Sequence, residues 1–223
     1  MCSDKTEAEV AALPRDEQRV WYGGTTAKEI LDPTNSRIGI HHWAAQGIVG
    51  RGVLLDYAAY AERHGIDFSA FSDHQIKLVD LLKCAEEDGV EFRPGDILFM
   101  RIGLVPEWNG YSREQRQAYK AQAVPLHAGL EATEDVARWM WDSHFAAVAS
   151  DAVSWELFPA LNPRMQLHQY LLPSWGVPIG ELFDLEGLAE ICRRLGRTSF
   201  FVSSVPFNVV GGVSSAPNAV AIF

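Results

Sequence analysis

The sequence predicts an α/β domain in which helices flank a mixed β-sheet. Short apolar runs of strand length alternate with amphipathic helical segments from residue 52 to the C-terminus, a pattern typical of this class. The 223 residues, of which 48% are hydrophobic, are enough to bury one substantial core. A polar, acidic arm is expected at residues 1–20. Because no linker or repeat interrupts the rest, we expect residues 21–223 to form one domain.

Each expected element has its own local signal. Apolar runs bounded by turn residues predict strands at residues 52–57, 93–103, 145–151, 199–207 and 218–223. Apolar residues near helical spacing predict helices at residues 74–89, 112–123, 133–143 and 184–196. Asp73 is the expected N-cap of the first helix. Ser112 and Gln115 form a capping box for the second, and Thr133 begins a looser version for the third.

Composition argues against several classes of protein. The net charge of −10 provides no broad basic surface for nucleic acid. No apolar run approaches the roughly 18 residues that a membrane helix needs, and the N-terminus lacks the apolar core of a signal peptide. Cys2, Cys84 and Cys192 are widely spaced and odd in number, which fits a reducing compartment. We therefore expect a cytoplasmic protein that binds a small molecule.

Glycines and histidines are the first candidates for chemistry. The stretch GIVGRG (47–52) precedes a strand and lacks a Walker lysine, so a structural turn is favoured over a phosphate loop. A turn is also favoured for VVGGVSS (209–215), with an anion-binding nest as the alternative. The seven histidines include no i, i+4 pair, and the adjacent His41 and His42 point in different directions. From the residues alone, His168 is only a weak candidate for a metal ligand.

Five blocks of sequence together resemble one known family. In chain order they are GIVGRGVLLDY, FRPGDILFMRIG, AAVASDAVSWE, LHQYLLPSWGVPIGELFDLEGLAE and VSSVPFNVVGGVSSAPNAVAIF. They resemble the metal-dependent hydrolases called "putative cyclases", whose best-known members are kynurenine formamidases. The resemblance runs from about residue 38 to the C-terminus and is closest to the longer branch, found widely in fungi and some bacteria. It implies a swivelling β/β/α fold and assembly as a homodimer or higher oligomer.

The resemblance also implies a site and a chemistry. His168 and Glu181 fall on the His and Glu that complete a site for one or two divalent metals, usually zinc or manganese. His168 would be a ligand or a proton donor, and Glu181 an oxygen ligand or a bridge between two ions. Asp151 would line the pocket, with a helix cap as an equal alternative. From the residues themselves, Trp43, Trp108, Trp155 and Trp175 are candidate walls of an apolar pocket, although ordinary core positions are favoured for most of them.

The N-terminus departs from the family pattern. The early His/Asp segment that supplies most of the family's metal ligands has no counterpart in residues 1–21, so we expect an N-terminally shortened member with an incomplete metal site. MRIGL (100–104) also replaces the usual Arg-Thr-Gly. Three explanations stay open. The gene model is shortened, the chain is a true short form without metal chemistry, or His41, His42 or a second subunit refills the site.

These observations predict a hydrolase of the arylformamidase type. Its substrate would be an amide, ester or lactone of a small aromatic or polyketide-like molecule, cleaved by a hydroxide that the metal activates. Two alternatives stay open. The first is a metal-free pocket that binds a small molecule or directs a ring closure. The second is a non-catalytic subunit of a full-length relative, because lost N-terminal elements would expose apolar surface that a partner covers.

Overall fold

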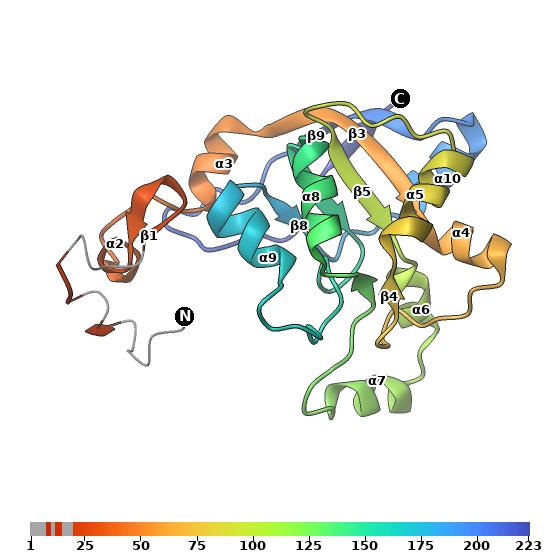
Figure 1. The fold of residues 1–223 in the computed structure, drawn as a ribbon, viewed down its shortest axis with the longest axis horizontal. Coiled ribbons are helices and arrows are strands. Elements are labelled where there is room, and N and C mark those ends of the chain that lie inside the picture. Colours follow the sequence, from red (N-terminus) through yellow and green to blue (C-terminus); the bar gives the residue numbers. More distant parts are fainter. Residues whose placement is uncertain (1–7, 10–11, 15–19) are drawn as a thin grey trace.

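A six-stranded mixed sheet forms the centre of the protein, in a computed structural model that describes residues 8–9, 12–14 and 20–223 (Figure 1). The strand order is β10-β9-β3-β5-β7-β8, in which β3, β5, β7 and β8 are parallel and β9 is antiparallel to both β3 and β10. The predicted α/β class with a mixed sheet is therefore confirmed. The strands are β3 (Ile48–Asp56), β5 (Ile97–Arg101), β7 (Ala147–Ser150), β8 (Ile179–Gly180), β9 (Ser199–Ser204) and β10 (Val220–Ile222).

The two faces of the sheet are covered differently. Alternate residues of a strand point to opposite faces, and in β5 Leu98 and Met100 belong to one apolar cluster while Ile97 and Phe99 belong to the other. The first cluster includes residues of α6 (Leu104–Gly110), of η2 (Tyr170–Trp175) and of four further helices, whereas one helix, α10, covers much of the second. These helices are α4 (Tyr57–His64), α5 (Leu78–Glu87), α8 (Glu134–Asp142) and α9 (Leu167–Gln169) on the first face, and α10 (Glu186–Leu195) on the second.

Local capping chemistry sets the start of several helices. Ser112 and Gln115 form the predicted capping box of α7 (Arg113–Lys120), and the Thr133 side chain accepts a hydrogen bond from Val136 N–H at the start of α8. The helix expected at residues 74–89 begins later, at Leu78. Its first residues instead form β4 (Gln75–Ile76), which pairs with the distant β6 (Gly129–Leu130), so Asp73 is not its cap.

The N-terminal elements lie to one side of the sheet in Figure 1. They contact the body in part through the loop between β9 and β10, since Ile40 N–H donates to the carbonyl of Gly212 (2.8 Å). Of the arm predicted at residues 1–20, most lies outside the described residues. None of the described helices is long and apolar enough to cross a membrane. The elements are β1 (Val20–Trp21), η1 (Tyr22–Gly24), β2 (Thr25–Thr26), α2 (Ala27–Leu31) and α3 (Ile40–Gln46).

The Gly-rich stretch at residues 47–52 was predicted as a turn, but residues 48–52 belong to strand β3. Gly52 lies inside β3 directly beneath the ring of Phe200, where a Cβ atom would approach a ring carbon to 2.3 Å. Gly211 has φ 70° and lies in a turn that the bond from Gly212 N–H to the carbonyl of Val209 closes at 2.9 Å. The turn predicted at 209–215 is confirmed.

Candidate functional site

His168 and Glu181 lie side by side at one end of the sheet. Glu181 directly follows β8, whose parallel pairing with β7 aligns Ile179 with Val148. His168 lies in the short helix α9, which precedes the six-residue turn η2 (Tyr170–Trp175). The imidazole Nε2 is 3.3 Å from Oε1 of Glu181. The structure thus brings together the two residues that the resemblance named, at the carboxyl edge where α/β sheets often bind ligands.

A second carboxylate, Glu156, holds the other side of the imidazole. Its Oε2 is 2.7 Å from His168 Nδ1, and its Oε1 accepts the backbone N–H of His168 at 3.0 Å. The Glu156 side chain is only 7% exposed. Sequence reasoning missed this residue because no spacing rule connects it to His168. The available signal was a charged residue between Trp155 and Leu157 in an apolar block.

The two carboxylates determine the charge of the imidazole. Hydrogen bonding to Glu156 and then to Glu181 raises the pKa of His168 to about 10, against the opposing effect of burial. At neutral pH the ring is therefore an imidazolium in this arrangement. Glu181 is also fixed in place, because its Oε1 accepts the backbone N–H of Trp155 at 2.9 Å. The site is a cation between two carboxylates.

An apolar cavity of about 630 Å³ adjoins this group. Its walls include Phe99 and Ala149 on the less covered face of the sheet, and Trp43 on α3. The uncharged loop at residues 205–219, between β9 and β10, supplies another wall. Among the described residues that line the cavity, His168 and Glu181 are the only ionisable ones. The two ionisable side chains thus lie in a mainly apolar cleft of the size that small ligands occupy.

Asp151 is completely buried at the end of β7. Its carboxylate accepts backbone N–H groups from Ile102 (2.7 Å), Gly103 (2.8 Å) and Leu104 (3.0 Å), at the start of α6 (Leu104–Gly110). Burial raises the pKa of this carboxyl group, and the three N–H bonds oppose that rise. These contacts are those of a helix cap, the alternative that the sequence left open, and Asp151 does not line the cavity.

Trp43 is the one of the four candidate tryptophans that lines the cavity, and Trp155 and Trp175 occupy different surroundings. Trp155 is fully buried in the first apolar cluster, and its indole N–H is the one buried side-chain polar atom of the described residues without a hydrogen-bond partner. Trp175 is half-buried and packs against Trp141, with ring centroids 5.1 Å apart. Neither is among the residues that line the cavity.

His41 and His42 both lie on α3, where their contacts are with neighbouring loops. His41 Nδ1 accepts the backbone N–H of Gly211 at 3.2 Å, and His42 Nε2 lies 2.8 Å from the carbonyl of Ser36. These contacts hold α3 to the loop between β9 and β10 and to the segment before α3.

The donor set does not by itself fit a catalytic metal. His168 Nε2 and the Glu181 carboxylate offer two ligands, and Glu156 is the carboxylate that a metal-binding histidine commonly has on its other nitrogen. Catalytic zinc usually takes three protein ligands. The described part of the chain contains no group of three or more His, Cys, Asp or Glu side chains that could hold an ion.

The fold and this site define a cyclase-type α/β protein. Residues 23–157 match the family described as "Putative cyclase", and the chain belongs to this family, as the resemblance implied. No curated protein matches the chain. The crystal structure of a novel cyclase is similar to it, with 28% identity and a TM-score of 0.76 over 92% of this chain and 64% of that one.

Isatin hydrolases share the fold at lower identity. Isatin hydrolase A from Labrenzia aggregata, bound to benzyl benzoate, is 14% identical, with a TM-score of 0.59 over 87% of this chain and 68% of that one. An isatin hydrolase bound to the product analogue thioisatinate is 16% identical, with a TM-score of 0.55 over 78% of this chain and 59% of that one. The chain therefore spans less than two thirds of the length of the novel cyclase and of this second isatin hydrolase.

Proposed function

We propose that this protein hydrolyses an amide, ester or lactone of a small apolar molecule, with His168 and Glu181 as the reacting side chains. The observation that carries the proposal is the single ionisable pair beside an apolar cavity of about 630 Å³. Membership of the cyclase family supports it, as does the fold shared with isatin hydrolases. Benzyl benzoate, the ligand bound to one of these hydrolases, is itself a neutral aromatic ester.

The lining of the cavity indicates a neutral, mainly apolar substrate. Aromatic and aliphatic side chains form most of the wall, and no Arg or Lys is among the described lining residues to pair with an anionic substrate. Ser204, Ser215 and Asn218 provide neutral polar groups at the loop side. A molecule of one or two rings fits a cavity of this size, with its carbonyl directed at His168.

The arrangement supports general acid and general base roles. Glu181 is 29% exposed, and in the described structure its hydrogen bond uses only Oε1. It can accept a proton from the attacking water while His168 donates its Nε2 proton to the departing nitrogen or oxygen. Afterwards the proton on Glu181 returns to Nε2 over the 3.3 Å that separates the two side chains. Water is consumed, and both side chains regain their starting state.

The zinc or manganese that the resemblance implies stays a prediction, as does assembly as a homodimer or higher oligomer. Metal analysis of protein purified without chelator tests the first, and light scattering tests the second. Near-stoichiometric metal that is lost in His168→Ala would show that His168 is a ligand. Metal-free protein with full turnover would assign the chemistry to the side chains alone.

Turnover of a probe panel tests the hydrolase proposal. Isatin, an aryl formamide and 4-nitrophenyl acetate sample a cyclic amide, an open-chain amide and an ester. We expect His168→Ala to lower kcat/KM on the order of 100-fold or more. His64→Ala is the matched control, because His64 also pairs with a carboxylate, Glu87 at 2.8 Å, but lies on the surface. Undiminished turnover by His168→Ala would overturn the proposal.

The apolar cavity also favours the second function, metal-free binding of a small molecule. In that case no probe is hydrolysed, but aromatic ligands bind saturably and change the fluorescence of Trp43, which lines the cavity. Titration of the wild-type protein with benzyl benzoate distinguishes the two functions, because binding without hydrolysis supports the second alone.

A further inference from the structure

Glu156 uses both of its oxygens on one residue, His168. Oε1 accepts the backbone N–H at 3.0 Å and Oε2 faces Nδ1 at 2.7 Å. Because an ionised carboxylate only accepts hydrogen bonds, Nδ1 must carry a proton and donate it. Two contacts from one buried carboxylate, one to the backbone and one to the ring, fix the backbone and the ring plane of His168 together.

This arrangement leaves Nε2 as the reactive atom. The Nδ1 contact is 2.7 Å, whereas Nε2 is 3.3 Å from Glu181, whose Oε1 is shared with the N–H of Trp155. His168 and Glu181 line the cavity, and Glu156 does not. The proton on Nδ1 is therefore held away from the cavity, and Nε2 is the ring nitrogen available to a substrate.

The backbone of Glu156 is placed by close contact with Gly129 of β6. A Cβ atom on residue 129 would lie 2.5 Å from the carbonyl carbon of Glu156 and 2.7 Å from the nitrogen of Leu157. Two backbone bonds hold the segments at this distance, from Leu130 N–H to the carbonyl of Trp155 (3.1 Å) and from Leu157 N–H to the carbonyl of Leu130 (3.0 Å). Any side chain at position 129 would push the Glu156 peptide away.

We propose that Glu156 is a positioning residue that keeps a proton on Nδ1 of His168 and fixes the orientation of its ring, and that Gly129 is required because a side chain there would displace the Glu156 backbone. Glu156 acts through His168 and does not touch the substrate. The catalytic part of this inference rests on the proposed hydrolase function, whereas the orientation of the ring does not.

A purely structural role for Glu156 makes a different prediction. If Glu156 only caps the turn at α9, then Glu156→Gln would preserve the function, because the amide oxygen still accepts the backbone N–H of His168. A positioning role is lost in the same variant, because the amide NH2 group takes the place of Oε2 and faces Nδ1–H, donor against donor. Glu156→Gln therefore separates the two roles at nearly constant shape.

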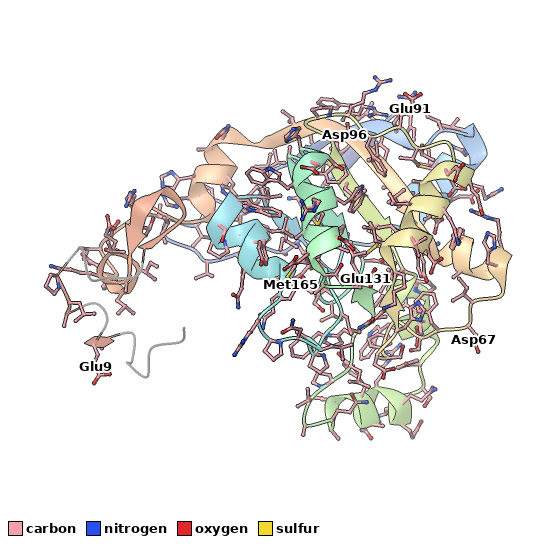
Figure 2. The ribbon with its side chains drawn as sticks, viewed as in Figure 1. Glu9, Asp67, Glu91, Asp96, Glu131 and Met165 are labelled. Atoms are coloured by element: carbon pink, nitrogen blue, oxygen red, sulfur yellow. The ribbon has the colours of Figure 1, made fainter. Side chains whose placement is uncertain are left out.

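Glu131→Gln is the matched control. Glu131 directly follows β6, its side chain is 17% exposed, and its Oε1 accepts the backbone N–H of Leu78 at 2.8 Å. Glu131 and Met165, both labelled in Figure 2, line one cavity, and Met165 lies on the segment leading into α9. It is a carboxylate of the same neighbourhood that caps a different helix.

The first readout is the Nδ1 proton of His168, observed by NMR in protein labelled with ¹⁵N-histidine. We expect a slowly exchanging Nδ1–H signal in the wild type, assigned by its loss in His168→Gln. Exchange with water should become at least about 10-fold faster in Glu156→Gln and stay unchanged in Glu131→Gln. An unchanged signal in Glu156→Gln, or equal loss in both variants, would overturn the proposal.

The second readout is turnover of the best probe substrate. We expect Glu156→Gln to lower kcat about 10- to 100-fold, as removal of such orienting carboxylates typically does, with KM changed less than about 2-fold. Gly129→Ala should reproduce the fall in kcat, because it displaces the Glu156 peptide while keeping its carboxylate. Unchanged kcat in a folded Glu156→Gln would contradict the catalytic part. If wild-type protein hydrolyses no probe, the hydrolase function fails, while the NMR result still decides the orientation.

Discussion

Two cations of this protein each lie between two carboxylates, near the carboxyl ends of the parallel strands of the same sheet. Arg101, the last residue of β5, contacts Asp56 at 2.7 Å and makes two bonds of 2.8 Å to Glu186. His168 contacts its two glutamates at 2.7 and 3.3 Å. The electrostatic pattern is the same, and in both places the neighbouring carboxylates raise the pKa of the cation.

The difference lies in whether the proton can leave and in what the cation faces. A guanidinium stays charged at every physiological pH, whereas an imidazolium can donate its proton. Arg101 is 15% exposed beside a cavity lined by charged side chains such as Arg63, Asp88 and Arg193, whereas His168 is 35% exposed beside an apolar one. We infer that the Arg101 group stabilises the fold and that the His168 group is the reactive one.

The largest expected effect on stability is at Arg101. Arg101→Met leaves Asp56 and Glu186 facing each other without a counter-ion, and should cost about 3 kcal/mol of unfolding free energy. Urea denaturation measures the cost. Arg63→Met, which removes an exposed arginine paired with Asp88, should cost less than about 1 kcal/mol. Equal losses of unfolding free energy in the two variants would contradict a special structural role for Arg101.

At His168 we expect a smaller loss of stability than at Arg101, together with a large loss of turnover. His168→Gln also removes a cation between two carboxylates, but its amide can still donate to Glu156, so the loss of stability should be smaller than at Arg101. Turnover, in contrast, should fall on the order of 100-fold. Denaturation and kinetics on the same preparation check both. A variant that loses as much stability as Arg101→Met would show that the His168 group is also structural.

His127, a histidine without a carboxylate hydrogen-bond partner, extends the comparison to the pH dependence of stability. His127 is 6% exposed, and its Nε2 is 2.7 Å from the hydroxyl of Tyr119. Burial lowers its pKa, more than the charge of Glu181 raises it. The folded state therefore favours the neutral ring. As pH falls through the unfolded value of about 6.5, the unfolded state binds more protons and stability is lost.

The measurement is the slope of unfolding free energy against pH between 7 and 5. His127→Gln removes this group and should give a shallower loss of stability on acidification than the wild type. The effect is smaller than those at Arg101 and His168. A steeper loss in the variant would show that the sign of the shift is wrong.

The elements that sequence predicted correctly depend on local chemistry. The caps at Ser112 and Thr133 act within a few residues, so the chain itself displays them. The start of α5 was predicted wrongly because Gln75 and Ile76 pair with a strand more than fifty residues away. Long-range pairing of this kind has no local signature.

The site residues also fall into those that the sequence indicated and those that only the structure revealed. His168 and Glu181 were named through the family resemblance, and the structure places them 3.3 Å apart. Glu156 was not found, because its role depends on folding that returns it to His168 and on the missing side chain of Gly129. The sequence does not reveal these roles, because the contact between the glycine of a short strand and the segment carrying the carboxylate exists only in the folded backbone.

The most direct test of the central claim is the hydrolysis rate of the best probe substrate by Glu181→Gln and by Arg63→Met, each at a matched folded fraction. Glu181 lies beside the imidazole and lines the apolar cavity, whereas Arg63 lines the charged cavity beside Arg101. We predict that Glu181→Gln lowers kcat/KM on the order of 100-fold while Arg63→Met retains the wild-type value. Wild-type turnover by Glu181→Gln, or an equal loss in both variants, would contradict the account.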